Sequence, residues 1–200
     1  MNVEIMFPVS LAVMDVPPAM REAVRAKLSA WLESDEGRRD LVASPTQSFL
    51  TTAASGHSVL ELAALPELQQ WALEAGSNFL QWFGVTGAKL AVKQSWVDVA
   101  RPGMQQNEHA HEGGLLSAIY YVEAAEGCGD LVFQDPVAAR RAHRAFTATN
   151  ASTKQSAQQM NHAPIEGRML MFESWLPHSV SGNKSTTPRV SIAIDLQRIN

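Results

Sequence analysis

The second half of this sequence consists of short runs of β-branched and aromatic residues, separated by turn residues. Such runs are typical of β-strands, and the turn residues indicate short connections between them. The expected strands cover residues 88–100, 114–124, 131–136, 168–174 and 189–199. In the last run the apolar positions alternate, at Val190, Ile192, Ile194 and Leu196. This succession of short strands predicts a sandwich or jelly roll.

The first half has a helical periodicity instead. After Pro18, apolar residues recur every four positions, at Met20, Val24, Leu28 and Leu32. This spacing predicts a helix, which we expect Gly37 to close. Residues 59–82 also indicate helical packing, with an interruption near Pro66. Helices followed by strands predict the α+β class: an all-β core with N-terminal helices packed on it.

A chain of 200 residues has the length of one domain. We expect a single domain over residues 1–200, with a helical part at about 17–83 and a β core at about 88–198. Two polar segments of the core, residues 137–163 and 175–188, are expected to be loops. Long loops inside a compact domain are usually functional or mobile.

Charge, hydropathy and cysteine content exclude several classes of protein. The 16 basic and 20 acidic residues give a net charge of −4, so we expect no nucleic acid as a partner. No apolar run reaches the ~20 residues of a membrane span, and the first residues lack the basic segment of a secretory signal. With Cys128 as the single cysteine, no internal disulfide can form, and we expect a cytoplasmic location.

Three of the six histidines form a candidate metal site. His109 and His111 are two positions apart, and such residues of a strand point to the same face, with Cα atoms ~6.5–7 Å apart. Two imidazoles in this arrangement can converge on one metal ion. His178 lies 67 residues after His111, beyond a predicted strand. The folding back of strands in a jelly roll could bring it to the same place.

A candidate anion site follows eleven residues after His178. Arg189 and Ser191 lie two positions apart in the last predicted strand, so they share one face. A guanidinium inside a β-sandwich is costly unless it has a partner, and its shape suits a carboxylate. The other interpretation of Arg189 is a solvated residue at the start of the strand.

The order H-x-H, H and R-x-S resembles that of the Fe(II)/2-oxoglutarate-dependent oxygenases, whose fold is a double-stranded β-helix, a form of jelly roll. Three further segments resemble strands of this family: SAIYYVE at 117–123, GCGDLVFQDP at 127–136 and GRMLMFESWLPHSV at 167–180. The likeness covers roughly residues 88–198. Within the superfamily it is greatest to an uncharacterised bacterial and phage group of 2OG-Fe(II) oxygenases with an H-x-H motif.

The resemblance implies roles for the candidate residues. Fe(II) would be held by His109, His111 and His178. The distal carboxylate of the cosubstrate 2-oxoglutarate would be bound by Arg189, assisted by Ser191 and by one of Tyr120 and Tyr121. Since adjacent strand residues face opposite ways, only one tyrosine can face the site; the family pattern favours Tyr121.

The sequence departs from the family at position 111. Most members hold iron with two histidines and one carboxylate, and here the carboxylate position is histidine. Two other registers are open: His111-Glu112-Gly113 could be an H-x-G motif in which the carboxylate is missing, or Glu112 could reach the metal if the backbone bulges.

The resemblance implies a hydroxylase-type dioxygenase that uses O2 and acts on a small molecule or a peptide side chain. Two other functions share the fold: a cupin-like metalloenzyme with three histidines and no 2-oxoglutarate, and an inactive binding protein. A homo-oligomer is possible, and the sequence does not identify the substrate.

Overall fold

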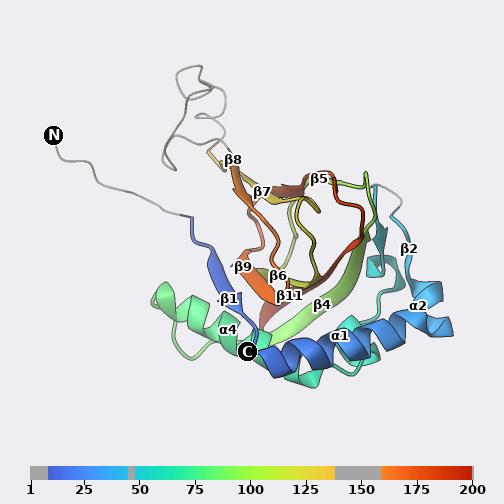
Figure 1. Cartoon of the computed structure of the whole chain (residues 1–200). Helices are drawn as coiled ribbons and strands as arrows, with labels where there is room; N and C mark the ends of the chain where they lie inside the picture. Colours follow the sequence, from blue (N-terminus) through green and yellow to red (C-terminus); the bar gives the residue numbers. More distant parts are fainter. Residues whose placement is uncertain (1–8, 45–47, 138–158, 200) are drawn as a thin grey trace, which may run out of the picture.

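The computed structural model describes residues 9–44, 48–137 and 159–199. Two antiparallel sheets face each other, and the helices lie on the outer side of the larger sheet (Figure 1). This is the expected α+β class with a jelly-roll core, so the predicted fold class is confirmed.

The larger sheet has seven strands in the order β1-β9-β6-β11-β4-β3-β2. Their bounds are β1 Ala12–Asp15, β9 Arg168–Glu173, β6 Leu116–Glu123, β11 Arg189–Ile199, β4 Lys89–Ala100, β3 Leu50–Thr51 and β2 Val42–Ala43. The long central strand β11 pairs with β4 on one side and β6 on the other. Because it is central, its backbone groups are paired on both edges, and its side chains are fixed on both faces.

The smaller sheet has the order β5-β10-β7-β8. Its strands are short: β5 Gln106–His109, β10 His178–Val180, β7 Leu131–Gln134 and β8 Gln159–His162. Strands β8 and β10 lie in segments that the sequence predicted to be loops, so those two predictions were wrong in part. Residues 138–158 of the first predicted loop lie outside the described residues.

Four α-helices occur in the described part of the chain: α1 Pro18–Glu33, α2 Asp35–Asp40, α3 Val59–Leu62 and α4 Pro66–Trp82. Pro18 suits the first turn of α1, where its missing N–H costs nothing. The expectation that Gly37 closes α1 was wrong: α1 ends at Glu33, and the hydroxyl of the next residue, Ser34, accepts a hydrogen bond from Gly37 N at 3.1 Å and so caps α2.

Two apolar cores lie on opposite sides of the larger sheet. The outer core joins the helices to residues such as Tyr120 and Ile192. The inner core lies between the sheets and contains Tyr121, Phe133 and Phe172. Adjacent tyrosines of β6 therefore point to opposite cores, as strand alternation requires.

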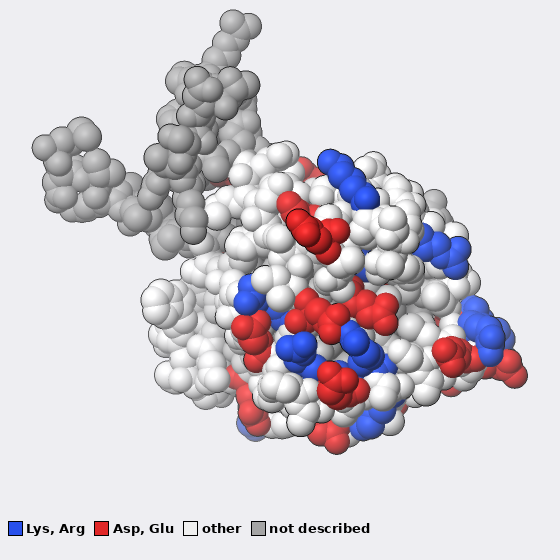
Figure 2. Space-filling view, viewed as in Figure 1, with Lys and Arg blue, Asp and Glu red and all other residues white. Residues whose placement is uncertain are grey.

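Acidic and basic side chains are interspersed on the face shown in Figure 2. No broad basic surface appears on this face. In the described part of the chain, no helix is both long and apolar enough to cross a membrane.

Candidate metal centre and carboxylate pocket

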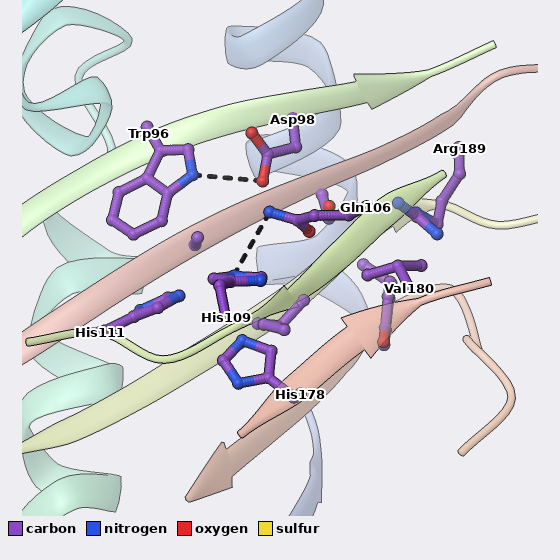
Figure 3. A pocket seen from close by; sticks show the side chains of 12 residues that line it. Trp96, Asp98, Gln106, His109, His111, His178, Val180 and Arg189 are labelled. Carbon is purple, nitrogen blue, oxygen red and sulfur yellow. Dashed lines mark hydrogen bonds between the residues drawn. The ribbon is translucent and has the colours of Figure 1, made fainter. Parts of the chain in front are cut away.

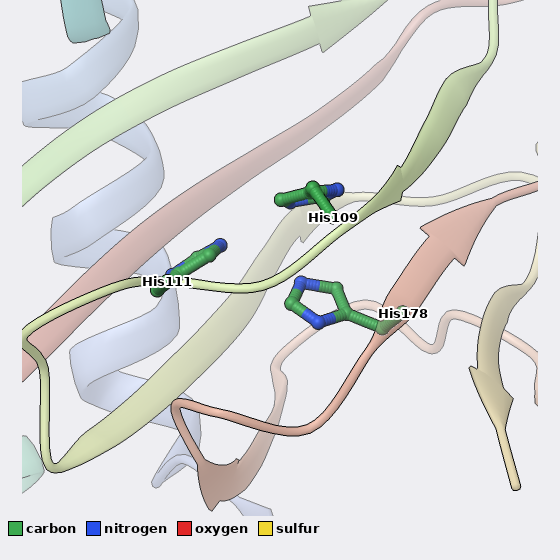
Figure 4. A group of neighbouring side chains, drawn as sticks. All are labelled: His109, His111 and His178. Atoms are coloured by element: carbon green, nitrogen blue, oxygen red, sulfur yellow. The ribbon is translucent and has the colours of Figure 1, made fainter. Parts of the chain in front are cut away.

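The three predicted histidine ligands come together between the two sheets. His109 ends β5, His178 begins β10, and the two residues are directly paired across these strands. His111 follows β5, so the H-x-H motif extends past the strand in which it was expected. One nitrogen from each imidazole lies within 4.8 Å of the others, and Figure 4 shows the rings facing a common point.

Backbone carbonyls orient two of the imidazoles. His109 Nδ1 lies 2.9 Å from Asn107 O, and His178 Nδ1 lies 2.9 Å from Leu176 O. A carbonyl oxygen can only accept, so each Nδ1 carries the hydrogen and each Nε2 keeps its lone pair. The Gln106 amide nitrogen faces His109 Nε2 at 3.4 Å, as a donor to that lone pair (Figure 3).

The third imidazole has a carboxylate as its partner. His111 Nδ1 lies 2.7 Å from Asp195 Oδ1, and this carboxylate also accepts a hydrogen bond from Ser117 Oγ at 2.7 Å. Ser117 Oγ lies 2.9 Å from Ser174 Oγ. Since the carboxylate accepts from Nδ1–H, the Nε2 atom of His111 is also left with its lone pair.

Burial favours the neutral, metal-binding form of two of the three histidines. Burial, with a smaller contribution from the neighbouring His109, lowers the pKa of His178 to about 3. The pKa of His109 is also lowered, mainly by burial. Phe172 packs edge-on against His178, with ring centroids 4.8 Å apart, and so restrains the ring. Three imidazoles whose Nε2 atoms can act as ligands fit a divalent transition metal.

Arg189 lies in the same pocket and is only 4% exposed. Its Nη1 makes long hydrogen bonds to Gly129 O at 3.3 Å and Cys128 O at 3.5 Å, while its buried Nε has no hydrogen-bond partner. Among the described residues, no carboxylate lies within ion-pair distance of this guanidinium. An incompletely paired buried cation fits the carboxylate of a bound ligand.

Further polar side chains line this pocket. Ser191 and Tyr121 are among its lining residues, whereas Tyr120 belongs to the outer core under the helices. Burial raises the pKa of Tyr121 well above its usual range, so its hydroxyl stays protonated and can donate a hydrogen bond. The pocket also contains Trp96 and Asp98, which are joined by a hydrogen bond of 3.1 Å (Figure 3).

The residues of the three registers considered for the H-x-H segment lie in different places. Glu112 is exposed and does not belong to the cluster of possible ligands. Gly113 has a φ of +72°, which places it in a turn beyond the site. His111 is the residue of this segment that joins His109 and His178.

Sequence reasoning missed Asp195 and Asp98. Asp195 lies six positions after Arg189 on the same face of β11, and this spacing was the available signal. Asp98 lies opposite Ser191 in the register of β4 and β11.

A jelly roll that brings three histidines and a buried arginine into one pocket fits a metal-dependent protein. The sequence also matches a family model described as "Putative 2OG-Fe(II) oxygenase" over residues 94–195, half of the chain. The chain belongs to this family: it is an oxygenase that depends on Fe(II) and 2-oxoglutarate, as the resemblance implied. A cupin-like enzyme is not favoured. No curated protein matches the sequence.

Solved structures share the fold. A prolyl-4-hydroxylase from Pseudomonas putida is 16% identical, with a TM-score of 0.58, over 96% of this chain and 94% of that one. HygX from Streptomyces hygroscopicus, solved with nickel, 2-oxoglutarate and hygromycin B, is 10% identical, with a TM-score of 0.60, over 94% and 82%. A prolyl hydroxylase from Trichoplax adhaerens, in complex with a hypoxia inducible factor peptide, is 12% identical, with a TM-score of 0.60, over 93% and 82%.

Proposed function

We propose that His109, His111 and His178 hold the iron and that Arg189 binds the distal carboxylate of 2-oxoglutarate. The observation that carries this proposal is the buried guanidinium with an unpartnered Nε, in the same pocket as the three imidazoles. The two features together suit a ligand that has a metal-chelating end and an anionic end.

The protein supplies orientation and a dry environment. The three Nδ1 hydrogen bonds fix the imidazole planes, so that the Nε2 atoms are positioned before the metal binds. Arg189, with hydroxyl groups from Ser191 and Tyr121, would hold the far carboxylate in the chelating orientation. When bound, the iron supplies oxidation of a C–H bond with O2 and 2-oxoglutarate.

The substrate is proposed to be a small molecule or a peptide side chain, which is hydroxylated. Proteins of the same fold have been solved with either kind of compound bound, hygromycin B in one case and a peptide in another. The single cysteine, Cys128, is buried and unpaired, which suits the cytoplasmic location that we propose. A homo-oligomer is compatible with these proposals.

Anaerobic titrations test the assignments. Fe(II) binding is measured first, and 2-oxoglutarate is then added while the weak visible charge-transfer band expected for this family is recorded. We expect His178→Ala to abolish Fe(II) binding. We expect Arg189→Ala to weaken 2-oxoglutarate binding by about 10- to 100-fold, the value of one or two lost charged hydrogen bonds, with Fe(II) binding nearly unchanged.

The matched control is Arg168→Ala, which removes an arginine from the surface end of β9. It should leave both affinities unchanged. Equal 2-oxoglutarate affinity in the wild type and Arg189→Ala would refute the carboxylate assignment, and full Fe(II) binding by His178→Ala would refute the metal assignment.

A further inference from the structure

The three imidazoles differ in what holds them. His109 and His178 donate to neutral backbone carbonyls, whereas His111 donates to the carboxylate of Asp195 at 2.7 Å. His111 is also the ligand that occupies the position where most of the family has a carboxylate. Of these three partners, only Asp195 is anionic, and it bonds to His111, the histidine at the position of the family's carboxylate.

We propose that Asp195 is a positioning residue that supplies, through His111, the negative charge that a ligating carboxylate supplies elsewhere in the family. This inference rests on the proposed assignment of the histidines as iron ligands. In this arrangement the site keeps a negative charge, but the charge lies one hydrogen bond further from the metal. The imidazole of His111 lies between the two.

The surroundings of Asp195 support this role. The residue is 6% exposed, and its carboxylate is hydrogen-bonded to His111 Nδ1 and Ser117 Oγ. Ser117 Oγ lies 2.7 Å from Asp195 Oδ1 and 3.0 Å from His111 Nδ1, so it supports the pair from the side. A buried carboxylate without a cation is costly, and a dication beyond His111 would supply the missing positive charge.

The sheet fixes the carboxylate at this point. Asp195 lies on the central strand β11, paired with Ser117 on one side and Gln94 on the other. His111 is held from its own backbone, since its N–H donates to Ser174 O at 2.9 Å. Both members of the pair are thus anchored independently of any metal, and their alignment requires no rearrangement when the ion binds.

The charge of the site explains why such a pair matters. A divalent ion with three neutral ligands keeps its full charge of +2, whereas one carboxylate ligand reduces the net charge to +1. A carboxylate hydrogen-bonded to a ligating imidazole makes that ligand more basic, and losing such a partner typically costs 10- to 100-fold in metal affinity. Asp195 is placed to provide this effect without occupying a coordination position.

The test is a double-mutant cycle on positions 111 and 195, read as anaerobic Fe(II) affinity by competition with a coloured chelator. Asp195→Asn keeps an oxygen that can accept from His111 and removes the charge. We expect it to weaken Fe(II) binding by about 10- to 100-fold. In the His111→Asp background, the imidazole that links Asp195 to the metal is gone, so Asp195→Asn should change Fe(II) affinity clearly less there.

The loss of the effect in this background separates an action through His111 from general damage, which would lower affinity equally in both backgrounds. Asp98→Asn is the matched control: it removes another buried carboxylate of the same pocket, one that bonds to Trp96 rather than to a ligand. It should change Fe(II) affinity clearly less than Asp195→Asn does.

Wild-type Fe(II) affinity in Asp195→Asn would overturn the inference. If that single variant does not fold, the comparison of His111→Asp with the double variant decides, and binding that is about 10- to 100-fold weaker in the double variant overturns it. These outcomes are distinct from a failure of the proposed function, which would appear as unchanged Fe(II) binding in His178→Ala.

Discussion

Asp98 should make the stability of the metal-free protein depend on pH. Its carboxyl is 7% exposed, its Oδ2 accepts a hydrogen bond from Trp96 Nε1, and its Oδ1 has no hydrogen-bond partner. Burial raises the pKa of Asp98 from 3.8 to about 6, against the opposing effects of its hydrogen bonds and of the nearby charge of Arg189. The substitution Asp98→Asn removes the titrating group with little change in shape.

The direction of the effect follows from proton binding. Between pH 4 and pH 6 the folded state holds the Asp98 proton more tightly than the unfolded state, so the free energy of unfolding falls as the pH rises. A pKa of about 6 instead of 3.8 corresponds to about 3 kcal/mol lost once both states are ionised. About 1 kcal/mol of this is already lost at pH 4.5, which leaves about 2 kcal/mol between pH 4.5 and pH 7.5.

Urea unfolding, followed by tryptophan fluorescence with a chelator present, measures this difference. The stability of Asp98→Asn relative to the wild type should increase by about 2 kcal/mol from pH 4.5 to pH 7.5. Glu126→Gln, which removes an exposed carboxyl from a turn, is the control and should show no such increase. A gap between Asp98→Asn and the wild type that stays constant or narrows with pH would refute the reasoning.

Three further substitutions have defined outcomes. Gly129→Ala should lower the free energy of unfolding by several kcal/mol, because Gly129 has a φ of +100° and an added Cβ would lie 2.2 Å from Ser181 O; normal urea stability would contradict this. Phe172→Ala should cost about 3–5 kcal/mol in the same assay, since Phe172 is fully buried, and it should also weaken Fe(II) binding through His178. Arg168→Ala breaks an exposed ion pair with Asp15 and should leave the thermal unfolding temperature nearly unchanged; a clear loss of stability would contradict this.

The sequence predicted the long elements because their periodicity reflects one buried face. The last run, 189–199, coincides with β11, and the spacing after Pro18 coincides with most of α1. The short strands β8 and β10 could not be predicted, because a run of three or four residues shows too little periodicity. These segments become strands by pairing with neighbouring strands of the folded sheet. The division of residues 1–200 into a helical part and a β core within one domain stays a prediction. The expected helical part also contains two short strands, β2 and β3.

The candidate site was predictable where the residue types are rare. The order of three histidines and one arginine, similar to that of the family, predicted the histidine cluster and the buried guanidinium. Asp195 escaped notice because the sequence reasoning considered only Arg189 and Ser191 on the polar face of β11 and assigned no role to the later residues of that face. Both faces are in fact buried, and the polar face, which carries Arg189, Ser191 and Asp195, lines the interior between the sheets.

Because these residues lie on β11, both ends of the candidate site depend on a single strand. Arg189, the proposed partner of the cosubstrate, and Asp195, which bonds to the proposed ligand His111, are separated by six residues of one strand, with both edges hydrogen-bonded. A one-residue insertion between them would turn one of the two to the opposite side of the sheet. Under the proposed assignments, side chains along β11 can be exchanged one at a time, whereas such an insertion would remove one of the two groups from the site.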